Sequence, residues 1–354
     1  MKLFIKYNAC ALLFILSSCG TPNINEKHAA EVVKKELALS GNVLAMDLSG
    51  GHSGAQLFKV TSESKQYVAR FITNKPPKYR EQEIFNLKVA ENGGYGPQIY
   101  FSDAARGIII MEYLAGKKLS PQDFRSDQFY VALAHLLQKI HRGKAFANSD
   151  YDVFKRINRH LQINKPKGSD YVPLAKLERV ITTIHQALLP HLTNTVPCHN
   201  DLHEGNLIFL GQEFKAIDYE NAGQNDPYFD MATVTSSAGF YSQSAHEQTL
   251  FKTYLERQPS KIENAKLYLM KQVVLIKRAL GALNRLGSSP EIIRQYSLIN
   301  APSLMELAIM ALENKMNLDD PETNLHLLKT ILNQVFENTE THEFRDAVDI
   351  LKQK

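Results

Sequence analysis

The chain of 354 residues contains no tryptophan and only three cysteines. Cys10 and Cys19 lie in the first twenty residues and Cys198 lies in the body, so the sequence offers no framework of disulfides. Neither sign of charge dominates, because 41 Lys and Arg stand against 37 Asp and Glu, a formal net charge of +4. This balance does not indicate nucleic-acid binding. Any aromatic pocket must be built from the 15 Tyr and 17 Phe residues.

Long hydrophobic runs are also scarce. The apolar run from Ala9 to Leu16 follows two lysines and is too short to span a bilayer, which takes roughly 20 residues. It fits the hydrophobic part of a secretory signal, and the stretch from Leu16 to Cys19 resembles a bacterial lipobox, whose cysteine carries lipid. We therefore expect residues 1–22 to be a signal or lipoprotein leader with a lipid anchor at Cys19. A chance apolar leader, or an over-long start, is the alternative.

The rest of the chain has the composition of a globular protein, with 44% hydrophobic and 22% charged residues. The periodicity of its apolar residues predicts strands at 43–48, 56–61, 66–72, 98–102 and 107–113. It predicts helices at 26–39, 79–92, 128–141, 151–163, 174–189, 227–237, 243–257 and 265–286, and in a further series to Lys354. We thus expect an α+β protein with a strand-rich N-lobe at 23–115 and a larger helical C-lobe at 116–354.

One polar stretch, residues 198–220, carries the strongest functional signal. Asp201 and Asn206 lie five residues apart, and a short apolar run leads from them to Asp218. Such spacing is typical of phosphoryl transfer, in which one carboxylate orients the attacking hydroxyl while an amide and a second carboxylate hold Mg²⁺. We predict that Asp201 is the catalytic base and that Asn206 and Asp218 are the metal ligands.

Two histidines flank the predicted base. We interpret His199 as a structural support of the loop. His203 either contacts the substrate or faces solvent. Two histidines near two aspartates would also permit a hydrolytic metal site, but no second histidine-rich motif follows in the sequence.

A glycine-rich turn precedes these motifs. Gly50, Gly51 and Gly54 would let backbone amides approach a polyanion closely, and we predict that they cover the nucleotide phosphates. The turn matches neither the dinucleotide fingerprint nor the Walker pattern. An ordinary hairpin turn is the alternative.

A lone cation follows on the third predicted strand. Arg70 lies among apolar and aromatic residues, where a charge is costly unless it meets phosphate or a carboxylate. Because protein kinases pair a strand lysine with a glutamate of the next helix, we predict that Arg70 binds phosphate and pairs with Glu83, or else with Glu81. An edge-strand arginine in solvent is the alternative. The crossing segment from Glu112 to Leu114 is expected to offer backbone groups to adenine.

These motifs together resemble the choline and ethanolamine kinase family, within the aminoglycoside-phosphotransferase-like group. The resemblance covers roughly residues 40 to 240. It rests on Gly50 and Gly51, on Arg70, and on the segments 80–83, 96–100, 107–119, 198–206, 217–220 and 222–232. It implies a two-lobed protein-kinase-like fold, ATP and Mg²⁺ as cofactors, and phosphorylation of a small alcohol. By position, Asp201 matches the base, Asn206 and Asp218 the metal ligands, and Arg70 the ATP-binding cation.

The resemblance also concerns the acceptor. In this family an acidic residue two positions after the metal-binding aspartate lines the amino-alcohol pocket, which implies that Glu220 binds substrate together with Asp201 and His203. Without tryptophan, the aromatic faces that attract a choline head must come from other rings. The candidates are Tyr219, Tyr228, Phe229, Tyr241, Tyr254, Tyr268 and Tyr296. The lack of tryptophan weakens the case for choline as the acceptor relative to ethanolamine, thiamine or another amino alcohol. For Glu220, a structural salt bridge is the alternative to substrate binding.

The segment after Glu220 is expected to support the site. The resemblance implies that Asp230 braces the catalytic loop, and Asp226 followed by Pro227 predicts a capped helix start. Choline is the first acceptor that we expect, then ethanolamine. A thiamine or aminoglycoside phosphotransferase and a non-catalytic, membrane-anchored binding protein with a kinase fold stay open. The lipoprotein-type leader indicates a membrane anchor, whereas a need for ATP indicates the cytoplasm.

Overall fold

The computed structural model of the chain describes residues 24–48, 55–63, 65–116, 123, 126–147, 151–168, 170–192, 195–236, 244–287, 290–312 and 315–353. The leader with Cys10 and Cys19, the three glycines at 50, 51 and 54, and Tyr241 lie outside these ranges, so what the sequence predicts for them stays a prediction. Within the described ranges, no helix combines the length and hydropathy that a bilayer-crossing helix requires.

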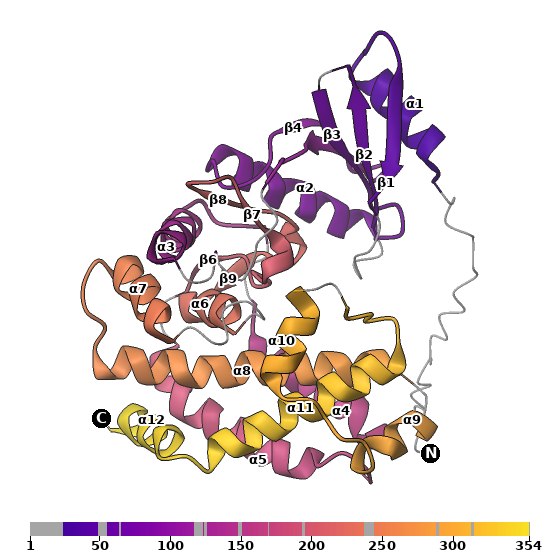
Figure 1. Ribbon diagram of the computed structural model, residues 1–354. Coiled ribbons are helices and arrows are strands. Elements are labelled where there is room, and N and C mark those ends of the chain that lie inside the picture. Colours follow the sequence, from indigo (N-terminus) through magenta and orange to yellow (C-terminus); the bar gives the residue numbers. More distant parts are fainter. Residues whose placement is uncertain are drawn as a thin grey trace, which may run out of the picture.

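The N-terminal part is built on one antiparallel sheet, seen at the top of Figure 1. Its strand order is β1-β2-β3-β5-β4. From β1 to β5 the strands are Val43–Asp47, Gln56–Ser62, Lys65–Phe71, Ile99–Asp103 and Ile108–Glu112. All five predicted strands are therefore present, with each end within one residue of its predicted position.

The two faces of this sheet bury different residues, because successive side chains of a strand point to opposite sides. Ala69 and Phe71 of β3 belong to a small core shared with helix α1 (Glu26–Glu36). Arg70, between them, points to the other side, toward helix α2 (Pro77–Asn92), where it meets Glu83. Helix α2 begins two residues earlier than predicted, since Pro77 is well suited to a first helical position.

The remainder of the described chain is mostly helical. Helices α3 to α7 are Asp127–His141, Val153–Gly168, Leu174–Leu188, Pro227–Thr235 and Ser244–Leu255, and α8 to α12 are Lys261–Leu286, Pro290–Arg294, Leu304–Leu312, Pro321–Thr339 and His342–Lys352. Helix α8 runs through this part and packs against α6, α4, α11 and α12 (Figure 1). It starts four residues before its predicted start, because Ser260 and Glu263 form a reciprocal capping box.

Short elements frame the polar stretch 198–220. Strands β6 (Val196–Cys198) and β9 (Gly223–Asn225) form one antiparallel ribbon, and β7 (Leu207–Phe209) and β8 (Phe214–Ala216) form another. Single turns of 3₁₀ helix also occur in the described ranges: η2 (Leu189–His191), η3 (Glu204–Asn206), η4 (Tyr219–Asn221) and η5 (Gln295–Ser297). The two ribbons fix the ends of the loop that carries Asp201 and of the segment that carries Asp218.

Candidate active site

The loop with Asp201 begins with an unusual backbone conformation. Asn200 has φ of 66°, in the left-handed region that asparagine tolerates better than most residues. Its side-chain amide donates to the Asn221 carbonyl at 3.0 Å, and its oxygen accepts from Asn225 at 2.8 Å. These bonds tie the turn before Asp201 to Asn221 and to Asn225 of β9.

Asp230 of α6 also holds this turn, through bonds to its backbone. Its carboxylate accepts hydrogen bonds from the backbone amides of His199 and Asn200, each at 2.7 Å. It also contacts Nε2 of His141 at 3.1 Å. Burial alone would raise the pKa of Asp230, but the bond from His141 and the amides outweigh it and lower this pKa. The implied bracing role of Asp230 is thereby confirmed, as is the helix cap at Asp226.

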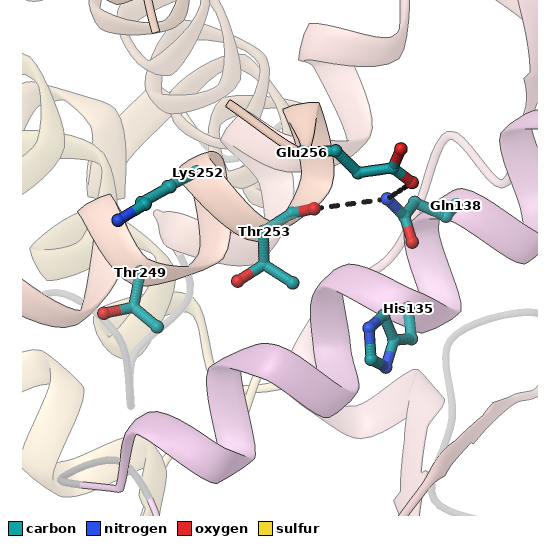
Figure 2. A pocket seen from close by; sticks show the side chains of 6 residues that line it. All are labelled: His135, Gln138, Thr249, Lys252, Thr253 and Glu256. Atoms are coloured by element: carbon teal, nitrogen blue, oxygen red, sulfur yellow. Dashed lines mark hydrogen bonds between the residues drawn. The ribbon is translucent and has the colours of Figure 1, made fainter. Parts of the chain in front are cut away.

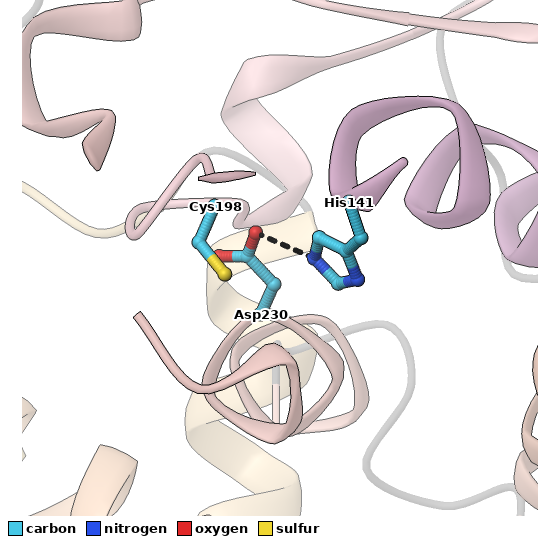
Figure 3. A group of neighbouring side chains, drawn as sticks. All are labelled: His141, Cys198 and Asp230. Atoms are coloured by element: carbon cyan, nitrogen blue, oxygen red, sulfur yellow. Dashed lines mark hydrogen bonds and ion pairs between the residues drawn. The ribbon is translucent and has the colours of Figure 1, made fainter. Parts of the chain in front are cut away.

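His141, Cys198 and Asp230 form a compact buried group (Figure 3). Their ligand atoms lie within 4.8 Å of one another, a separation that a metal ion could bridge. However, both carboxylate oxygens of Asp230 already accept hydrogen bonds, and burial raises the pKa of the Cys198 thiol, which donates to the Asn225 carbonyl. A protonated thiol is a poor metal ligand. The group is therefore a structural support of the loop.

The predicted base and metal ligands belong to one hydrogen-bonded unit. The Asn206 amide nitrogen donates to the Asp201 carbonyl at 2.9 Å, and the Asn206 carbonyl accepts from the Ile217 amide at 3.0 Å. Asp218 follows directly, with φ of 65° in the left-handed region. Since its side-chain nitrogen makes this bond, a cation bound at Asn206 would have to use the side-chain oxygen. These two bonds link the loop of Asp201 and Asn206 to the segment of Asp218, although the residues are up to 17 positions apart in sequence.

Arg70 links this unit to the N-terminal sheet. Its guanidinium contacts Glu83 at 2.7 Å and Asp218 at 3.0 Å, and Arg70 and Glu83 are almost fully buried. Burial alone would lower the pKa of Arg70, but Asp218 and Glu83 outweigh it and raise this pKa. The predicted pairing with Glu83, in preference to Glu81, is present.

Lys75 is a second cation at this place, and sequence reasoning missed it. Its ammonium lies 2.8 Å from Glu83 and 2.5 Å from Glu220. Arg80 fixes the loop, because it donates to the Lys75 carbonyl at 2.6 Å and also to the Thr73 carbonyl. In the sequence Lys75 precedes Pro76 and Pro77, a position that gives no indication of these ion pairs.

Glu220 lies among these charges. Burial and then the neighbouring Asp218 carboxylate raise the pKa of Glu220, although Lys75 opposes them. The structure therefore places Glu220 with the cations of the N-terminal part. Glu220 contacts Lys75, which also binds the Glu83 partner of Arg70. Asp201 contacts a different lysine, Lys277.

A magnesium ion fits the donor atoms of this cluster. Arg70 and Lys75 face three carboxylates, Glu83, Asp218 and Glu220, which leaves one net negative charge. Carboxylate and amide oxygens are the hard ligands that Mg²⁺ prefers. Asp218 with the Asn206 side-chain oxygen would therefore hold the metal.

The surroundings of Asp201 differ from those of Asp218. Lys277 of α8 contacts the Asp201 carboxylate at 3.2 Å. Burial alone would raise the pKa of Asp201, but Lys277 and then the two neighbouring histidines outweigh it and lower this pKa. His203 accepts a hydrogen bond from the Gly205 amide, and burial lowers its pKa, which favours the neutral ring at pH 7. His199 is fully buried and contacts the Ile217 carbonyl at 2.9 Å, which confirms its structural role.

The crossing segment after β5 adds little chemistry through its side chains. The Glu112 carboxylate accepts from the Gln98 amide at 3.2 Å and lies 3.3 Å from the Lys215 ammonium. The Leu114 carbonyl accepts from the Gly116 amide at 2.8 Å. The predicted contacts of Glu112 and Leu114 with adenine stay a prediction.

Most of the aromatic candidates have other partners. The Tyr219 hydroxyl donates to the Tyr95 carbonyl at 3.1 Å, and Tyr254 contacts His141 at 2.8 Å. The rings of Tyr228 and Tyr296 are covered by Lys266 and Lys329. Among the candidates, Phe229 lies beside Lys277. The ring of Phe229 contacts that of Tyr151, a residue that sequence reasoning missed.

A separate cavity of about 490 Å³ lies between α3 and α7 (Figure 2). Its lining residues are polar: His135, Gln138, Thr249, Lys252, Thr253 and Glu256. Gln138 closes one side, since its amide donates to the Thr253 carbonyl at 3.2 Å and to Glu256 at 3.0 Å. None of the predicted site residues lines this cavity.

The sheet, the helical part and the loop between them define a two-lobed, protein-kinase-like fold with a phosphotransferase-type site. A solved structure of a choline/ethanolamine kinase family protein from Mesorhizobium loti superposes with a TM-score of 0.67. It is 18% identical and is matched over 92% of this chain and 99% of that one, a likeness that shows the fold. The chain belongs to the phosphotransferase enzyme family, whose pattern it matches over residues 45–261.

Curated relatives are similar to parts of the chain. Protein LicA of Haemophilus influenzae is 25% identical over 179 residues, which are 49% of this chain and 66% of the relative. Ethanolamine kinase 2 of Rattus norvegicus is 29% identical over 160 residues, 43% of this chain and 41% of the relative. The chain thus spans less than two thirds of the length of these relatives.

Proposed function

We propose that the protein transfers the γ-phosphoryl group of ATP to the hydroxyl of a small alcohol. The observation that carries the proposal is the hydrogen-bonded unit of Asp201, Asn206 and Asp218, tied through Arg70 to Glu83. This set supplies a base, two metal ligands and a cation for phosphate. Membership of the phosphotransferase enzyme family supports the same reading.

Each of these residues has a separate task. A bound Mg²⁺ would neutralise charge on the nucleotide phosphates. Asp201 uses Oδ1 for Lys277, so its other oxygen is available to align the acceptor hydroxyl and take its proton. The lowered pKa keeps Asp201 ionised and able to act as a base. The acceptor oxygen then bonds to the γ-phosphorus as the bond to the β,γ-bridging oxygen breaks, which yields a phosphate monoester and ADP.

Choline and ethanolamine are the first acceptors to test. The sequence motifs favour them, and relatives carry the names ethanolamine kinase 2 and choline/ethanolamine kinase family protein. Two lysine contacts of this chain, Lys75 with Glu220 and Lys277 with Asp201, weigh against a cationic acceptor. The panel therefore also includes thiamine, an aminoglycoside and uncharged alcohols.

Replacement of the base tests the proposal. We expect Asp201→Asn to lower phosphate transfer by roughly 10²–10⁴-fold, because the amide cannot accept the hydroxyl proton. Release of ADP with each acceptor measures the rate, and calorimetry measures nucleotide binding, which should persist. Asp103→Asn is the matched control and should leave the rate unchanged, since Asp103, the last residue of β4, pairs with Arg106 in the turn that follows. Normal turnover by Asp201→Asn refutes the mechanism. Tight binding of one acceptor by the wild type without transfer would indicate the non-catalytic binding protein.

A further inference from the structure

The ammonium of Lys277 occupies the immediate surroundings of the proposed base. Lys277 lies in the second half of α8, and its Nζ is 3.2 Å from Oδ1 of Asp201 and 3.3 Å from the Asn200 carbonyl. The two side chains are partly exposed, 29% for Lys277 and 34% for Asp201. A ligand that reaches Asp201 from solvent therefore also meets Lys277.

Two aromatic rings complete this environment. The Lys277 ammonium lies 5.5 Å from the centre of the Phe229 ring and 5.9 Å from that of Tyr151. These rings are neighbours, with centres 5.6 Å apart. Cations are attracted to aromatic faces within about 6 Å. A carboxylate with two rings is the kind of surrounding that receives a ligand ammonium, and in this chain a side chain of the protein already fills it.

Lys277 is charged under ordinary conditions. Burial alone would lower its pKa, but Tyr151 and the Asp201 carboxylate outweigh burial and raise it. The next residue, Arg278, donates to the backbone carbonyls of Thr233 and Ser236. Burial lowers its pKa, although the nearby Glu204 and then Asp201 carboxylates favour its charged form. Lys277 is thus the cation that faces Asp201 directly, and removal of its counter-ion would leave a partly buried charge without compensation.

The other carboxylate suited to a cationic head is also paired. Glu220 binds the Lys75 ammonium at 2.5 Å. Both acidic groups that the sequence assigned to the acceptor therefore already contact a lysine of the chain. A ligand ammonium two carbon atoms from the reacting hydroxyl would have to lie close to Lys277 or displace it, and like charges at such distances repel.

We propose that Lys277 determines the charge of the acceptor, so that the subsite at Asp201 takes small alcohols without a positive charge near the reacting hydroxyl. This inference rests on the proposed phosphotransferase function and narrows its acceptor. Uncharged polyols and hydroxy acids share the required chemistry. A hydroxy acid would gain from its carboxylate beside the Lys277 ammonium, whereas a quaternary or primary ammonium alcohol would be disfavoured.

A matched pair of acceptors tests the proposal on the wild-type protein. Choline and 3,3-dimethyl-1-butanol have the same shape, with nitrogen replaced by carbon in the second. We expect the kcat/KM of the neutral alcohol, measured by ADP release, to be at least roughly tenfold above that of choline. Ethanolamine should likewise be slower than 1-propanol, and 3-hydroxypropionate and glycerate should be accepted at least as well as the neutral alcohols.

Variants separate the role of Lys277 from a general effect. Lys277→Met should reduce the preference for the neutral member of the pair at least roughly tenfold, since the repulsive charge is gone. Lys271→Met is the matched control, because Lys271 lies on the same helix and pairs with Glu247 outside the site. It should leave the preference unchanged. Thermal unfolding followed by circular dichroism shows whether each variant is folded.

The affinity of the same alcohols, measured by calorimetry, tests the charge selection independently of turnover. If no acceptor is phosphorylated, the proposed function fails, but the wild type should still bind the neutral isostere more tightly than choline. Three results overturn the charge selection: choline turned over or bound as well as its isostere, a preference that Lys277→Met does not change, and no binding of any uncharged or anionic alcohol.

Discussion

Asp230 offers the sharpest test of how the catalytic loop is held. Its carboxylate is fully buried and accepts from the His199 and Asn200 amides and from His141. In Asp230→Asn an NH₂ group replaces one carboxylate oxygen. This group is a hydrogen-bond donor, and it faces the donors that the oxygen accepted from. A hydrogen bond to a charged group contributes roughly 1.5–3 kcal/mol, and an orphaned buried donor costs roughly 1–3 kcal/mol. We therefore expect the free energy of unfolding to fall by about 3 kcal/mol.

The assay combines stability with kinetics. Urea unfolding followed by far-ultraviolet circular dichroism gives the loss of stability, which is large beside a total of about 5–15 kcal/mol. The kcat of phosphate transfer should fall as well, because Asp201 follows directly after the two amides that Asp230 holds. Nucleotide affinity should change little, since Arg70 and Glu83 are outside this network.

A surface aspartate provides the control. Asp127, at the start of α3, contacts His246 and Thr249 and is largely exposed, so Asp127→Asn should behave like the wild type. If Asp230→Asn changes the free energy of unfolding by less than about 0.5 kcal/mol, the range of ordinary surface substitutions, the bracing argument is refuted.

Two further predictions concern helix α8. Leu283→Ala should cost about 2–5 kcal/mol in urea unfolding, because the side chain is fully buried and the change leaves a cavity; a cost near zero would show that the core around α8 can collapse. Glu263 has its pKa lowered to about 2, first by the two-point contact with Arg257, against an ordinary value of 4.5. A carboxylate whose pKa is lowered by folding stabilises the fold at every pH above its unfolded-state pKa. The difference in stability between the wild type and Glu263→Gln should therefore be constant above about pH 5 and shrink as the pH falls toward 2. A difference that grows on acidification would contradict this linkage.

The parts of the site that are close in sequence could be predicted from it. Asp201 and Asn206 lie on one loop, Asp218 follows after the short β7–β8 ribbon, and local spacing suffices to propose that they act together. The pairing of Arg70 with Glu83 was also predictable, because a cation in an apolar strand needs a partner and the following helix supplies one. The strands followed from their apolar pattern, which alternates at 66–72 and is continuous at 108–111. Helix ends shifted by a few residues: a proline and a capping box extended α2 and α8, whereas α1, α6 and α7 end earlier than predicted.

The contacts made across the fold could not be predicted. Lys277 is 76 positions from Asp201, on a long amphipathic helix where a lysine has no local signal. Lys75 stood in a turn-forming segment, and only the structure shows that its ammonium crosses to Glu220, 145 positions away. The Lys277 contact depends on how α8 packs against the loop of Asp201, and the Lys75 contact depends on how the sheet meets the helical part. Both contacts change the expected charge of the site.

The ion cluster between the two lobes has a consequence for how members of this family can be recombined. Arg70 and Lys75 come from the N-terminal part, while Asp218 and Glu220 come from the helical part. Separated, one half would keep two cations against the single charge of Glu83, and the other half would hold two adjacent carboxylates without a counter-ion. A chimera that joins this sheet to the helical part of a relative must therefore match the charges at all five positions. The two halves are complementary in charge, and we expect a substitution that removes a charge in one half to need a compensating substitution in the other.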